Sequence, residues 1–569
     1  MSTPLPAAPL LDVSLTAGEV FPGTPSEEVF FATTGWTHPV TYFVGRNGSG
    51  KSRSAKLVAQ RAGGRFLSTD RLAGLMLYTN YGWTSVPATE GFRGVPLGGQ
   101  ERDQARGLSQ SGSGIDEMYA LKEQPEVWLR VAAFLRRALG RVMELRENAG
   151  YLDPYVRIDN VEYSLLRDEG HGLRELVILL TAIYREDWTL LVVDEPELHL
   201  HPSMARLWLT ELERVCRAGQ RRAVVVTHEP SMVKPANASD LGAVWYFSPG
   251  RASLPLSKHL PAGQEHRVTA SLQNNPQLVS QLVFSPRPVL VEGVHDVAAL
   301  TVTLARTQPP EVVAQTDLIE CGGSGGVALW FEIARAIGLD VRAVADLDAC
   351  LAPEVQRVMD ATPNVVERYR GDLSAEPPTT AAVLRPLLEV MNNSGVEANP
   401  KARAKWLAGQ VPPETGWASR SAKLQAIWRE AGLWLHAQGT LEDVLGITVK
   451  GREAAQTAAA TSGDIDCVAN WCAYSLDPLG DVEILLSAAV ERIAHSIMEA
   501  LRVNPGTEFR APVGGSAVSD SRLVSVVPVS DGTHRLTVLK PDAFAGRWLE
   551  FSRETPSSQL ILRPALEAR

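Results

Sequence analysis

The sequence predicts an α/β protein in which two parallel-sheet domains follow one another and a small β-rich region ends the chain. Residues 189–194 and 222–228 are nearly continuous apolar runs, which are typical of strands buried on both faces of a parallel sheet. Apolar runs alternate with helical patterns again from residue 287 to residue 346, and such alternation favours βαβ units. After Arg510, short valine-containing segments favour strands. A chain of 569 residues is also too long for one hydrophobic core.

Changes in composition mark the expected domain boundaries. Glycine, glutamine, serine and arginine are frequent in residues 94–114, and a helical pattern runs from about residue 126 to residue 148. Proline, serine, glutamine and asparagine are frequent between Pro249 and Pro288, which indicates a connection between modules. We therefore expect a first α/β domain over residues 1–250 with a helical insertion at about 95–150, a linker over 251–284, a second α/β domain over 285–460 with a helical, partly basic insertion at about 352–430, and a helical and β-rich region over 461–569.

The composition is that of a globular protein without a membrane anchor. Hydrophobic residues make up 45% and charged residues 21% of the chain, and no apolar run approaches the ~20 residues that cross a bilayer. The first residues show no basic segment before an apolar core, so we expect a cytoplasmic protein. Five scattered cysteines without a Cys-x-x-Cys pair favour reduced thiols. A net charge of −10 confines any nucleic-acid contact to a local basic patch.

A phosphate-binding loop is the most specific motif of the chain. Residues 45–52 read Gly-Arg-Asn-Gly-Ser-Gly-Lys-Ser and stand between an apolar run and a helical pattern. The glycines let backbone N–H groups point at phosphate oxygens, Lys51 reaches the terminal phosphates and the Ser52 hydroxyl binds Mg²⁺. We expect the loop to bind ATP and Mg²⁺ through Gly45, Asn47, Gly48, Gly50, Lys51 and Ser52.

A second motif supplies the acids that ATP hydrolysis needs. Asp194 ends an apolar run, where it suits Mg²⁺, and Glu195 is placed to polarise the attacking water. Residues 194–202, Asp-Glu-Pro-Glu-Leu-His-Leu-His-Pro, resemble the Walker B region of ABC-type ATPases of the RecF, SMC and OLD kind. The resemblance implies that His228, at the end of the next apolar run, is the switch histidine that contacts the γ-phosphate.

The same resemblance implies that two ATPase heads meet as a homodimer. Residues 169–176 occupy the place of the ABC signature motif but lack the usual Ser-Gly-Gly-Gln text. Gly172 and the helix N-terminus at this place can still present N–H groups to the nucleotide of a second head. His199 and His201 flank a leucine as a metal-binding pair could, but the family pattern explains both residues without a metal.

Acidic residues follow two strands of the second predicted domain. Glu292 ends an apolar run, Asp296 stands four residues later, and Asp346 and Asp348 leave another strand at alternate positions, so that both can face one pocket. Carboxylates are hard oxygen ligands that favour Mg²⁺ or Mn²⁺. Two such ions about 4 Å apart stabilise the attacking hydroxide and the leaving oxygen of a phosphodiester. We expect Glu292, Asp296, Asp346 and Asp348 to bind metal, and Glu292, Asp346 and Asp348 to be catalytic.

The order of these elements resembles a Toprim fold. Glu-Gly-x-x-Asp ends one strand, a glycine loop at residues 322–326 follows the next, and Asp-x-Asp follows the third. An ABC-type ATPase followed by Toprim resembles the OLD (overcoming lysogenization defect) family of nucleases, over roughly residues 40–230 and 285–450. This resemblance implies a further metal ligand, Glu442, and an assisting catalytic lysine, for which Lys450 is the candidate.

The resemblance implies an ATP-regulated, Mg²⁺-dependent DNA endonuclease or nickase that acts in defence against phage. It also implies DNA binding without strong sequence specificity and a partner protein in defence. The alternative is a non-cleaving ABC-type ATPase scaffold or sensor that binds and controls a partner effector. The acids at positions 292, 346 and 348 argue against the alternative, because a docking module has no need of them.

A basic and aromatic segment is the candidate DNA path. Six cations in residues 397–429 are interleaved with tryptophans, a pattern that suits phosphate contacts with some base stacking. The other interpretation is a helical hairpin with tryptophans in its core and cations in water. The residues concerned are Lys401, Arg403, Lys405, Arg420, Lys423 and Arg429, with Trp406, Trp417 and Trp428.

Overall fold

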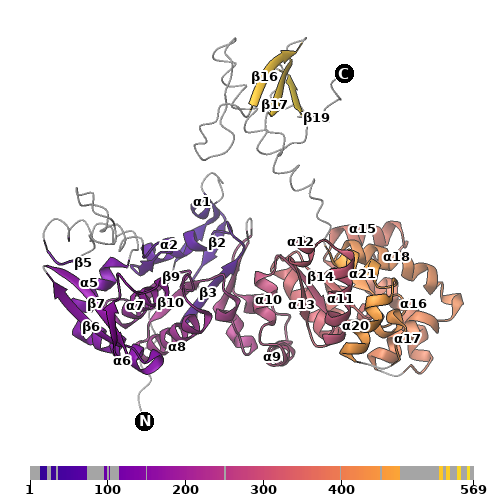
Figure 1. The fold of residues 1–569 in the computed structure, drawn as a ribbon. Helices are drawn as coiled ribbons and strands as arrows, with labels where there is room; N and C mark the ends of the chain where they lie inside the picture. The colour runs from indigo at the N-terminus through magenta and orange to yellow at the C-terminus, as the bar shows by residue number, and fades with distance from the viewer. Residues whose placement is uncertain are drawn as a thin grey trace. The chain divides into compact units, whose positions relative to one another are not determined.

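The computed structural model describes two units, residues 1–472 and residues 473–569 (Figure 1). In the first unit the fold is mixed α/β, as predicted, with two separate parallel sheets. No helix in the described part of the chain is long and apolar enough to cross a membrane. The described residues are 13–21, 27–33, 36–72, 95–98, 102, 114–148, 150–248, 251–396, 399–448 and 451–473, together with four strands between residues 524 and 563.

The first sheet holds the phosphate-binding loop at its carboxyl edge. Its strand order is β11-β3-β10-β9-β4, and all neighbouring strands are parallel. Helix α2 and the hairpin of β1 and β2 share one hydrophobic cluster with the sheet, while α7 and α8 pack on the other face. The elements are β1 (Ser14–Thr16), α1 (Ala17–Val20), β2 (Val29–Ala32), β3 (Val40–Gly45), α2 (Lys51–Arg61), β4 (Arg65–Leu67), α7 (His171–Tyr184), β9 (Leu190–Asp194), α8 (Pro202–Gly219), β10 (Arg222–Val226) and β11 (Val244–Phe247).

The predicted helical insertion at 95–150 is only partly helical. Helices α5 (Ile115–Glu123) and α6 (Pro125–Leu139) are present, but the helical pattern expected as far as residue 148 ends at Leu139. Gly140 adopts a left-handed conformation with φ of +67°, which terminates the helix. The chain then forms an antiparallel sheet of β5 (Val95–Pro96), β6 (Val142–Asn148), β7 (Tyr151–Ile158) and β8 (Val161–Ser164).

The segment predicted as a linker, residues 251–284, is a packed helical connection. It contains η3 (Leu256–His259), α9 (Glu265–Asn274) and α10 (Leu278–Phe284). Val268 and Leu272 stand one helical turn apart and are both buried, so apolar spacing outweighs the polar composition. Before it lie η1 (Pro230–Met232) and η2 (Ala238–Ala243).

The second sheet places three strand ends at one edge. Its order is β13-β12-β14-β15, and every pair of neighbours is parallel. The carboxyl ends of β12, β13 and β14 therefore lie side by side, which brings Glu292, Glu320 and Asp346 together. The elements are β12 (Arg287–Val291), α11 (Val294–Thr307), α12 (Pro310–Val313), β13 (Thr316–Glu320), α13 (Ser324–Ala336), β14 (Arg342–Ala345), η4 (Leu347–Leu351) and β15 (Leu433–Leu435).

The predicted insertion between residues 352 and 430 is helical, but its tryptophans do not form a stacking surface. Trp406, Trp417 and Trp428 are all buried, and the Trp417 indole donates to Leu407 O at 2.9 Å. The hairpin-core interpretation is therefore correct for the tryptophans, because their large apolar rings gain more from burial than from exposure. The helices are α14 (Pro353–Asp360), α15 (Pro363–Gly371), α16 (Thr380–Asn393), α17 (Pro400–Gly409), η5 (Pro413–Thr415) and α18 (Trp417–Glu430).

The second domain extends beyond the predicted boundary at residue 460. After α19 (Leu441–Leu445), helices α20 (Arg452–Thr461) and α21 (Asp466–Cys472) pack against α11. Arg306 of α11 pairs with Asp466 of α21, and Gln308 Nε2 donates to Asn470 Oδ1 at 2.5 Å. In the second unit an antiparallel sheet agrees with the predicted β-rich tail, with β16 (Val524–Val529), β17 (Thr533–Val538), β18 (Trp548–Ser552) and β19 (Ile561–Arg563).

Candidate functional site

The phosphate-binding loop joins β3 to α2 in the expected way. Gly45, with φ of +142°, ends the strand where a Cβ atom would lie 2.3 Å from Phe247 O, so only glycine fits. Asn47 and Gly48 are exposed in the loop, and Gly50, with φ of +89°, caps the helix. The loop thus has the turn that the motif predicts, with α2 beginning at its end.

Lys51 is buried inside this loop. Its Nζ donates to Gly45 O at 2.8 Å and to Arg46 O at 2.9 Å. Burial lowers the pKa of Lys51 to about 8, although the charges of Asp194 and Glu195 oppose this shift. The ammonium group is therefore held in place by main-chain carbonyls and lies within electrostatic reach of both acids.

Ser52 and Asp194 form the pair that the sequence assigns to Mg²⁺. Ser52 Oγ donates to Asp194 Oδ1 at 3.0 Å. Burial raises the pKa of Asp194 to about 6, while the Ser52 hydrogen bond acts in the opposite direction. One hydroxyl and one carboxylate, both hard oxygen ligands, thus face each other at the carboxyl edge of the sheet, as a P-loop magnesium site requires.

Glu195 and His228 face each other at the ends of neighbouring strands. Glu195 Oε1 lies 3.8 Å from His228 Nε2. Glu195 has a left-handed backbone with φ of +48°, a conformation that costs a residue with a Cβ atom about 1–2 kcal/mol. Burial and the charge of Lys51 lower the pKa of His228, so the ring tends to be neutral. The sequence-predicted base and switch histidine are thus brought together.

Glu197 supports His228 and was missed in the sequence. Its Oε1 accepts hydrogen bonds from His228 N and from Thr227 Oγ1, each at 2.8 Å. Burial raises the pKa of Glu197, and these two hydrogen bonds lower it. The only signal in the sequence was its place two residues after Glu195, inside the Walker B string.

The signature-like segment lies beside the Walker B segment of its own head. Gly172 stands in the first turn of α7, and a Cβ atom there would lie 2.9 Å from His199 O. His201 caps α8, since its Nδ1 accepts from Ser203 N at 3.3 Å. A helix cap therefore explains His201 without a metal, and the role of Gly172 toward a second head stays a prediction.

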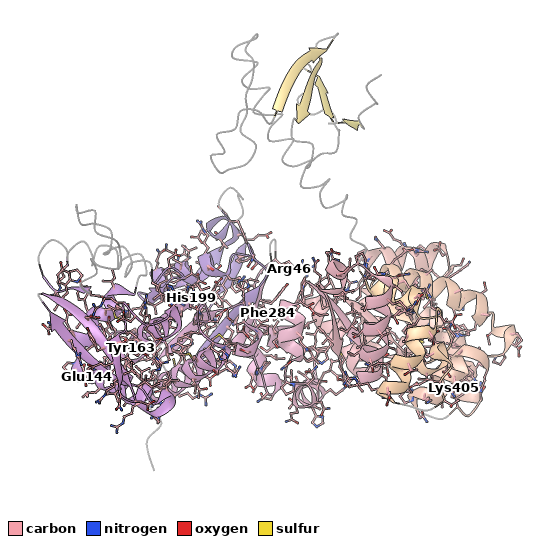
Figure 2. All side chains as sticks on the ribbon, in the orientation of Figure 1. Arg46, Glu144, Tyr163, His199, Phe284 and Lys405 are labelled. Atoms are coloured by element: carbon pink, nitrogen blue, oxygen red, sulfur yellow. The ribbon has the colours of Figure 1, made fainter. Side chains whose placement is uncertain are left out.

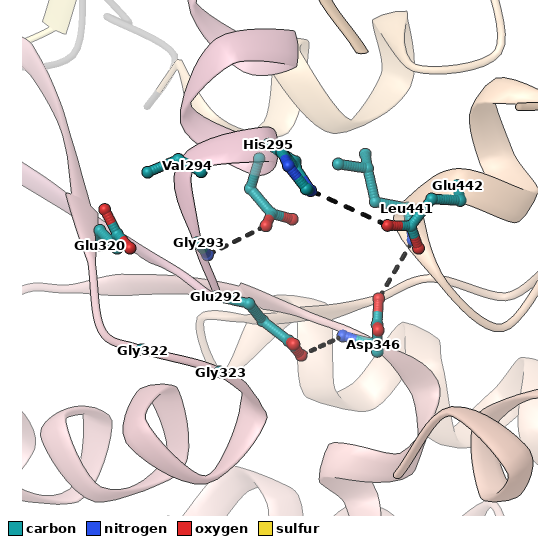
Figure 3. Close-up of a pocket in the computed structure, with 11 residues that line it drawn as sticks. Glu292, Gly293, Val294, His295, Glu320, Gly322, Gly323, Asp346, Leu441 and Glu442 are labelled. Carbon is teal, nitrogen blue, oxygen red and sulfur yellow. Dashed lines mark hydrogen bonds and ion pairs between the residues drawn. The ribbon is translucent and has the colours of Figure 1, made fainter. Parts of the chain in front are cut away.

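A pocket of about 330 Å³ opens at the carboxyl edge of the second sheet (Figure 3). Carboxylates dominate its wall, and they come from three strand ends and two helix starts. Gly322 and Gly323 form a loop in this wall, with φ values of +79° and +102°. Because these two glycines have no side chains, the wall is open at this loop. The pocket is lined by Glu292, Gly293, Val294, His295, Asp296, Glu320, Gly322, Gly323, Asp346, Leu441 and Glu442.

Main-chain N–H groups hold three of these carboxylates. Glu292 Oε1 accepts from Asp346 N at 2.8 Å, and Asp346 Oδ1 accepts from Leu441 N at 3.1 Å (Figure 3). Asp296 Oδ2 accepts from Gly293 N at 3.1 Å. Glu292 and Asp346 are thus oriented by the backbone of neighbouring elements, and Asp296 by the start of its own helix α11.

Asp348 does not line this pocket, contrary to the expectation that it shares a face with Asp346. Alternate residues share one face only while the chain stays extended as a strand. Here the 3-10 helix η4 begins at Leu347, so Asp346 and Asp348 do not share a face. Asp348 instead lies next to Ser324, whose hydrogen bond lowers its pKa, and within reach of the charge of Arg403. Burial is the larger influence and raises the pKa of Asp348 to about 6. Its Oδ1 is buried without a hydrogen-bond partner.

The electrostatics of the pocket favour a bound cation. Burial raises the pKa of Glu292 far above its usual range, and the charge of Asp346 raises it further. Burial and the charge of Asp296 raise the pKa of Asp346 in the same way. Across the described residues, no three His, Cys, Asp or Glu side chains are already arranged as a metal-binding group. The donor chemistry fits a hard divalent ion, whose charge would relieve the repulsion among these acids.

Two residues of the pocket were missed in the sequence, and one predicted residue cannot be placed. Glu320 ends β13 beside Glu292, a position that the parallel strand order alone reveals. His295 Nδ1 lies 4.0 Å from Glu442 Oε1, so the predicted ligand Glu442 faces a histidine. Asp443 caps α19 through Thr440. Lys450 lies outside the described residues.

Comparison with protein families identifies both domains. Residues 144–234 match the family described as "AAA domain, putative AbiEii toxin, Type IV TA system". Residues 283–348 match "Overcoming lysogenization defect protein-like, TOPRIM domain". The chain combines an AAA/ABC-type ATPase domain with an OLD-like TOPRIM domain. The TOPRIM match ends at Asp348 and contains the acids of β12, β13 and β14.

Known proteins resemble parts of the chain. The Old nuclease of Escherichia phage P2 is 27% identical over 197 residues, which are 32% of this chain and 33% of that protein. The match therefore spans about a third of the length of this relative. The Smc head domain of Pyrococcus furiosus bound to the C-terminal domain of ScpA aligns with 28% of this chain and 42% of its own at 14% identity, with a TM-score of 0.20. An Smc head of Pyrococcus yayanosii with a coiled coil and joint aligns with 30% of this chain. The alignment covers 35% of the Smc chain at 14% identity, with a TM-score of 0.20.

The helical insertion of the TOPRIM domain carries three cations on helix α17. Helix α17 packs against η4, which contains Asp348. Lys401, Arg403 and Lys405 form no ion pair with any acid of the described residues. Lys405 is exposed at the outer edge of the insertion (Figure 2). Of these three cations, Arg403 acts electrostatically on Asp348.

Proposed function

We propose that this chain is an ATP-regulated, Mg²⁺-dependent DNA endonuclease or nickase. The observation that carries the proposal is the pocket of five carboxylates at the carboxyl edge of the TOPRIM sheet, in a chain that also has a P-loop. A docking module gains nothing from buried acids that repel one another, whereas a metal-dependent nuclease needs them. The OLD-like TOPRIM match supports the same activity.

In the TOPRIM pocket, Glu292, Asp296, Asp346 and Glu442 would hold Mg²⁺ or Mn²⁺, with Asp348 beside them. When bound, such ions lower the pKa of a water molecule and stabilise the leaving oxygen of the phosphodiester. The glycine loop at residues 322–323, which lines the pocket without side chains, would let a DNA strand approach its mouth. The cations of α17 and α18 would bind the flanking phosphates, which gives affinity without sequence preference.

In the ATPase domain, Lys51 and the loop amides would bind the phosphates of ATP, and Ser52 and Asp194 would hold its Mg²⁺. Glu195 would orient the attacking water while His228 contacts the γ-phosphate. Gly172 of a second copy would complete the site, so that nucleotide promotes pairing of two heads. The resemblance to the OLD family supports a role in phage defence, with or without a partner protein.

The deciding experiment is cleavage of supercoiled plasmid by the full chain with Mg²⁺ or Mn²⁺, with and without ATP. Asp346→Asn keeps the shape of the pocket but removes a charge, and we expect it to reduce nicking by more than about 100-fold. Asp317→Asn is the matched control, because Asp317 is exposed on β13, three residues before Glu320. Lys51→Ala would reveal whether nucleotide licenses or restrains cleavage.

The outcomes separate the nuclease from an ATPase scaffold. Nicking that is lost in Asp346→Asn and kept in Asp317→Asn assigns cleavage to the TOPRIM pocket. Plasmid left intact by the wild-type protein in every condition would refute the nuclease proposal and favour a scaffold or sensor that controls a partner effector. Equal nicking by the wild type and Asp346→Asn would point to a contaminating nuclease.

A further inference from the structure

Arg71 is a fully buried cation that joins three parts of the ATPase domain. Its Nη1 donates to Ser68 O at 2.6 Å and to Asp194 O at 2.8 Å, and its Nη2 donates to Glu195 O at 2.8 Å. Its Nε forms an ion pair with Glu175 of α7. One side chain therefore links the segment after β4, the end of β9 and helix α7, within whose first turns the signature-like segment lies.

The carbonyl groups that Arg71 holds belong to the two acids of the nucleotide site. Glu195 N donates to Val226 O at 2.8 Å, so the peptide groups on both sides of Glu195 are fixed. A left-handed backbone such as that of Glu195, with φ of +48°, persists only where its surroundings hold it. In this conformation the Glu195 carboxylate faces His228. The direction of the hydrolytic carboxylate therefore depends on the anchoring of its main chain.

The bonding pattern of Arg71 exceeds what packing of α7 requires. A salt bridge to Glu175 alone would tie the helix to the loop. The guanidinium also donates hydrogen bonds to two carbonyl groups of the Walker B segment, Asp194 O and Glu195 O. A lysine has one nitrogen and cannot reach a carboxylate and three separate carbonyls at once, so the planar, forked group is needed here.

We infer that Arg71 is a positioning residue for ATP hydrolysis. It holds the main chain at Asp194 and Glu195 so that the Glu195 carboxylate faces the γ-phosphate side of the site, and Glu175 in turn holds Arg71. The inference rests on the proposed ATPase function of this chain. The sequence offered no signal for it, because Arg71 lies outside both nucleotide-binding motifs.

The test compares Arg71→Lys with Glu175→Gln in the full chain. Steady-state turnover yields kcat and KM for ATP, calorimetry yields ATP affinity, and thermal unfolding reports the fold. We expect Arg71→Lys to bind ATP within about threefold of the wild type while kcat falls at least about tenfold, since binding groups stay in place and the water-orienting carboxylate does not. Glu175→Gln keeps the carbonyl anchors, so its kcat should fall less than about threefold.

A double variant protects the test against misfolding. Arg71→Met with Glu175→Met removes both partners of the buried pair and leaves no unpaired charge, an exchange that folded proteins often tolerate. It should fold and show the same loss of kcat as Arg71→Lys. A folded Arg71→Lys or double variant that turns over ATP at the wild-type rate overturns the inference, as does a raised KM with kcat unchanged.

The same assay separates this inference from the proposed function. A wild-type protein that binds ATP but never hydrolyses it would overturn the ATPase part of the proposed function together with the role of Arg71. An active wild type beside an equally active, folded Arg71→Lys would overturn the role of Arg71 alone. If the wild type and Glu175→Gln hydrolyse ATP and Arg71→Lys hydrolyses it slowly, the result supports both the ATPase function and the role of Arg71.

Discussion

The nucleotide site and the TOPRIM pocket contain the same kind of acid but balance its charge differently. In the nucleotide site, the buried ammonium of Lys51 faces Asp194 and Glu195. In the TOPRIM pocket, Glu292 and Asp346 share a wall with three further carboxylates, and no lysine or arginine is found among the described residues that line it. The first site carries a cation of its own, whereas the second needs protons or cations from solution.

The balance of charge determines how each site responds to its ligand. A site with its own cation is ordered for an anionic ligand, and Mg²⁺ arrives there with the nucleotide. A pocket of repelling carboxylates is ordered for cations, which add stability as they bind. Replacement of an acid of the pocket and addition of metal test this contrast directly.

Replacement of Glu292 by glutamine should have the largest effect. Nicking should fall by more than about 100-fold, because the metal loses a ligand. The metal-free protein should become more stable by roughly 1–3 kcal/mol, because burial and Asp346 disfavour the Glu292 charge. Plasmid assays and urea denaturation in EDTA measure the two effects. Asp317→Asn should change neither, and a Glu292→Gln variant less stable than the wild type would contradict the contrast.

The second prediction concerns His436, which is buried just after β15 with neither ring nitrogen hydrogen-bonded. Burial lowers its pKa to about 4, against an unfolded value of about 6.5. The depressed pKa means that its contribution to stability is present above pH 6.5 and is lost as the pH falls toward 4. Between pH 7 and pH 5 this loss amounts to about 2 kcal/mol.

A His436→Leu variant isolates this contribution from that of the carboxylates. Urea denaturation of both proteins at pH 7 and pH 5 should show the wild type losing about 2 kcal/mol more than the variant. Equal losses in the two proteins would mean that the histidine is hydrogen-bonded or hydrated in solution. The acids of the pocket shift stability in the opposite direction, since their raised pKa values favour the protonated fold at low pH.

The smallest expected effect is stabilisation by metal alone. Mg²⁺ at ten times its dissociation constant should raise the free energy of unfolding by about 1.4 kcal/mol, since it binds the folded pocket. Calorimetric unfolding with and without Mg²⁺, in the absence of nucleotide, measures the shift. The same shift in Glu292→Gln would place the metal elsewhere, whereas Lys51→Ala should keep the full shift because Lys51 lies outside the pocket.

The parts of the fold that rest on local patterns were predictable. The P-loop at residues 45–52 and the strand that ends at Asp194 follow from short motifs whose chemistry is contained in neighbouring residues. The helical pattern near Leu139 was extended too far, because the strand that follows is stabilised by pairing with β7 and has no strong local signal. In the connection at residues 251–284 the polar composition conceals the helical spacing of Val268 and Leu272, which α9 buries.

By itself, the sequence determined the two parallel-sheet domains, the nucleotide loop and the strand ends that carry Glu292 and Asp346. These features depend on residues within a few positions of one another. Tertiary contacts alone bring Glu320 into the pocket, leave Asp348 out of its lining and bring Arg71 to the Glu195 main chain. Strand order brings Glu320 to Glu292, η4 redirects Asp348, and Arg71 meets its partner 124 residues away, so none of these contacts is encoded in local spacing.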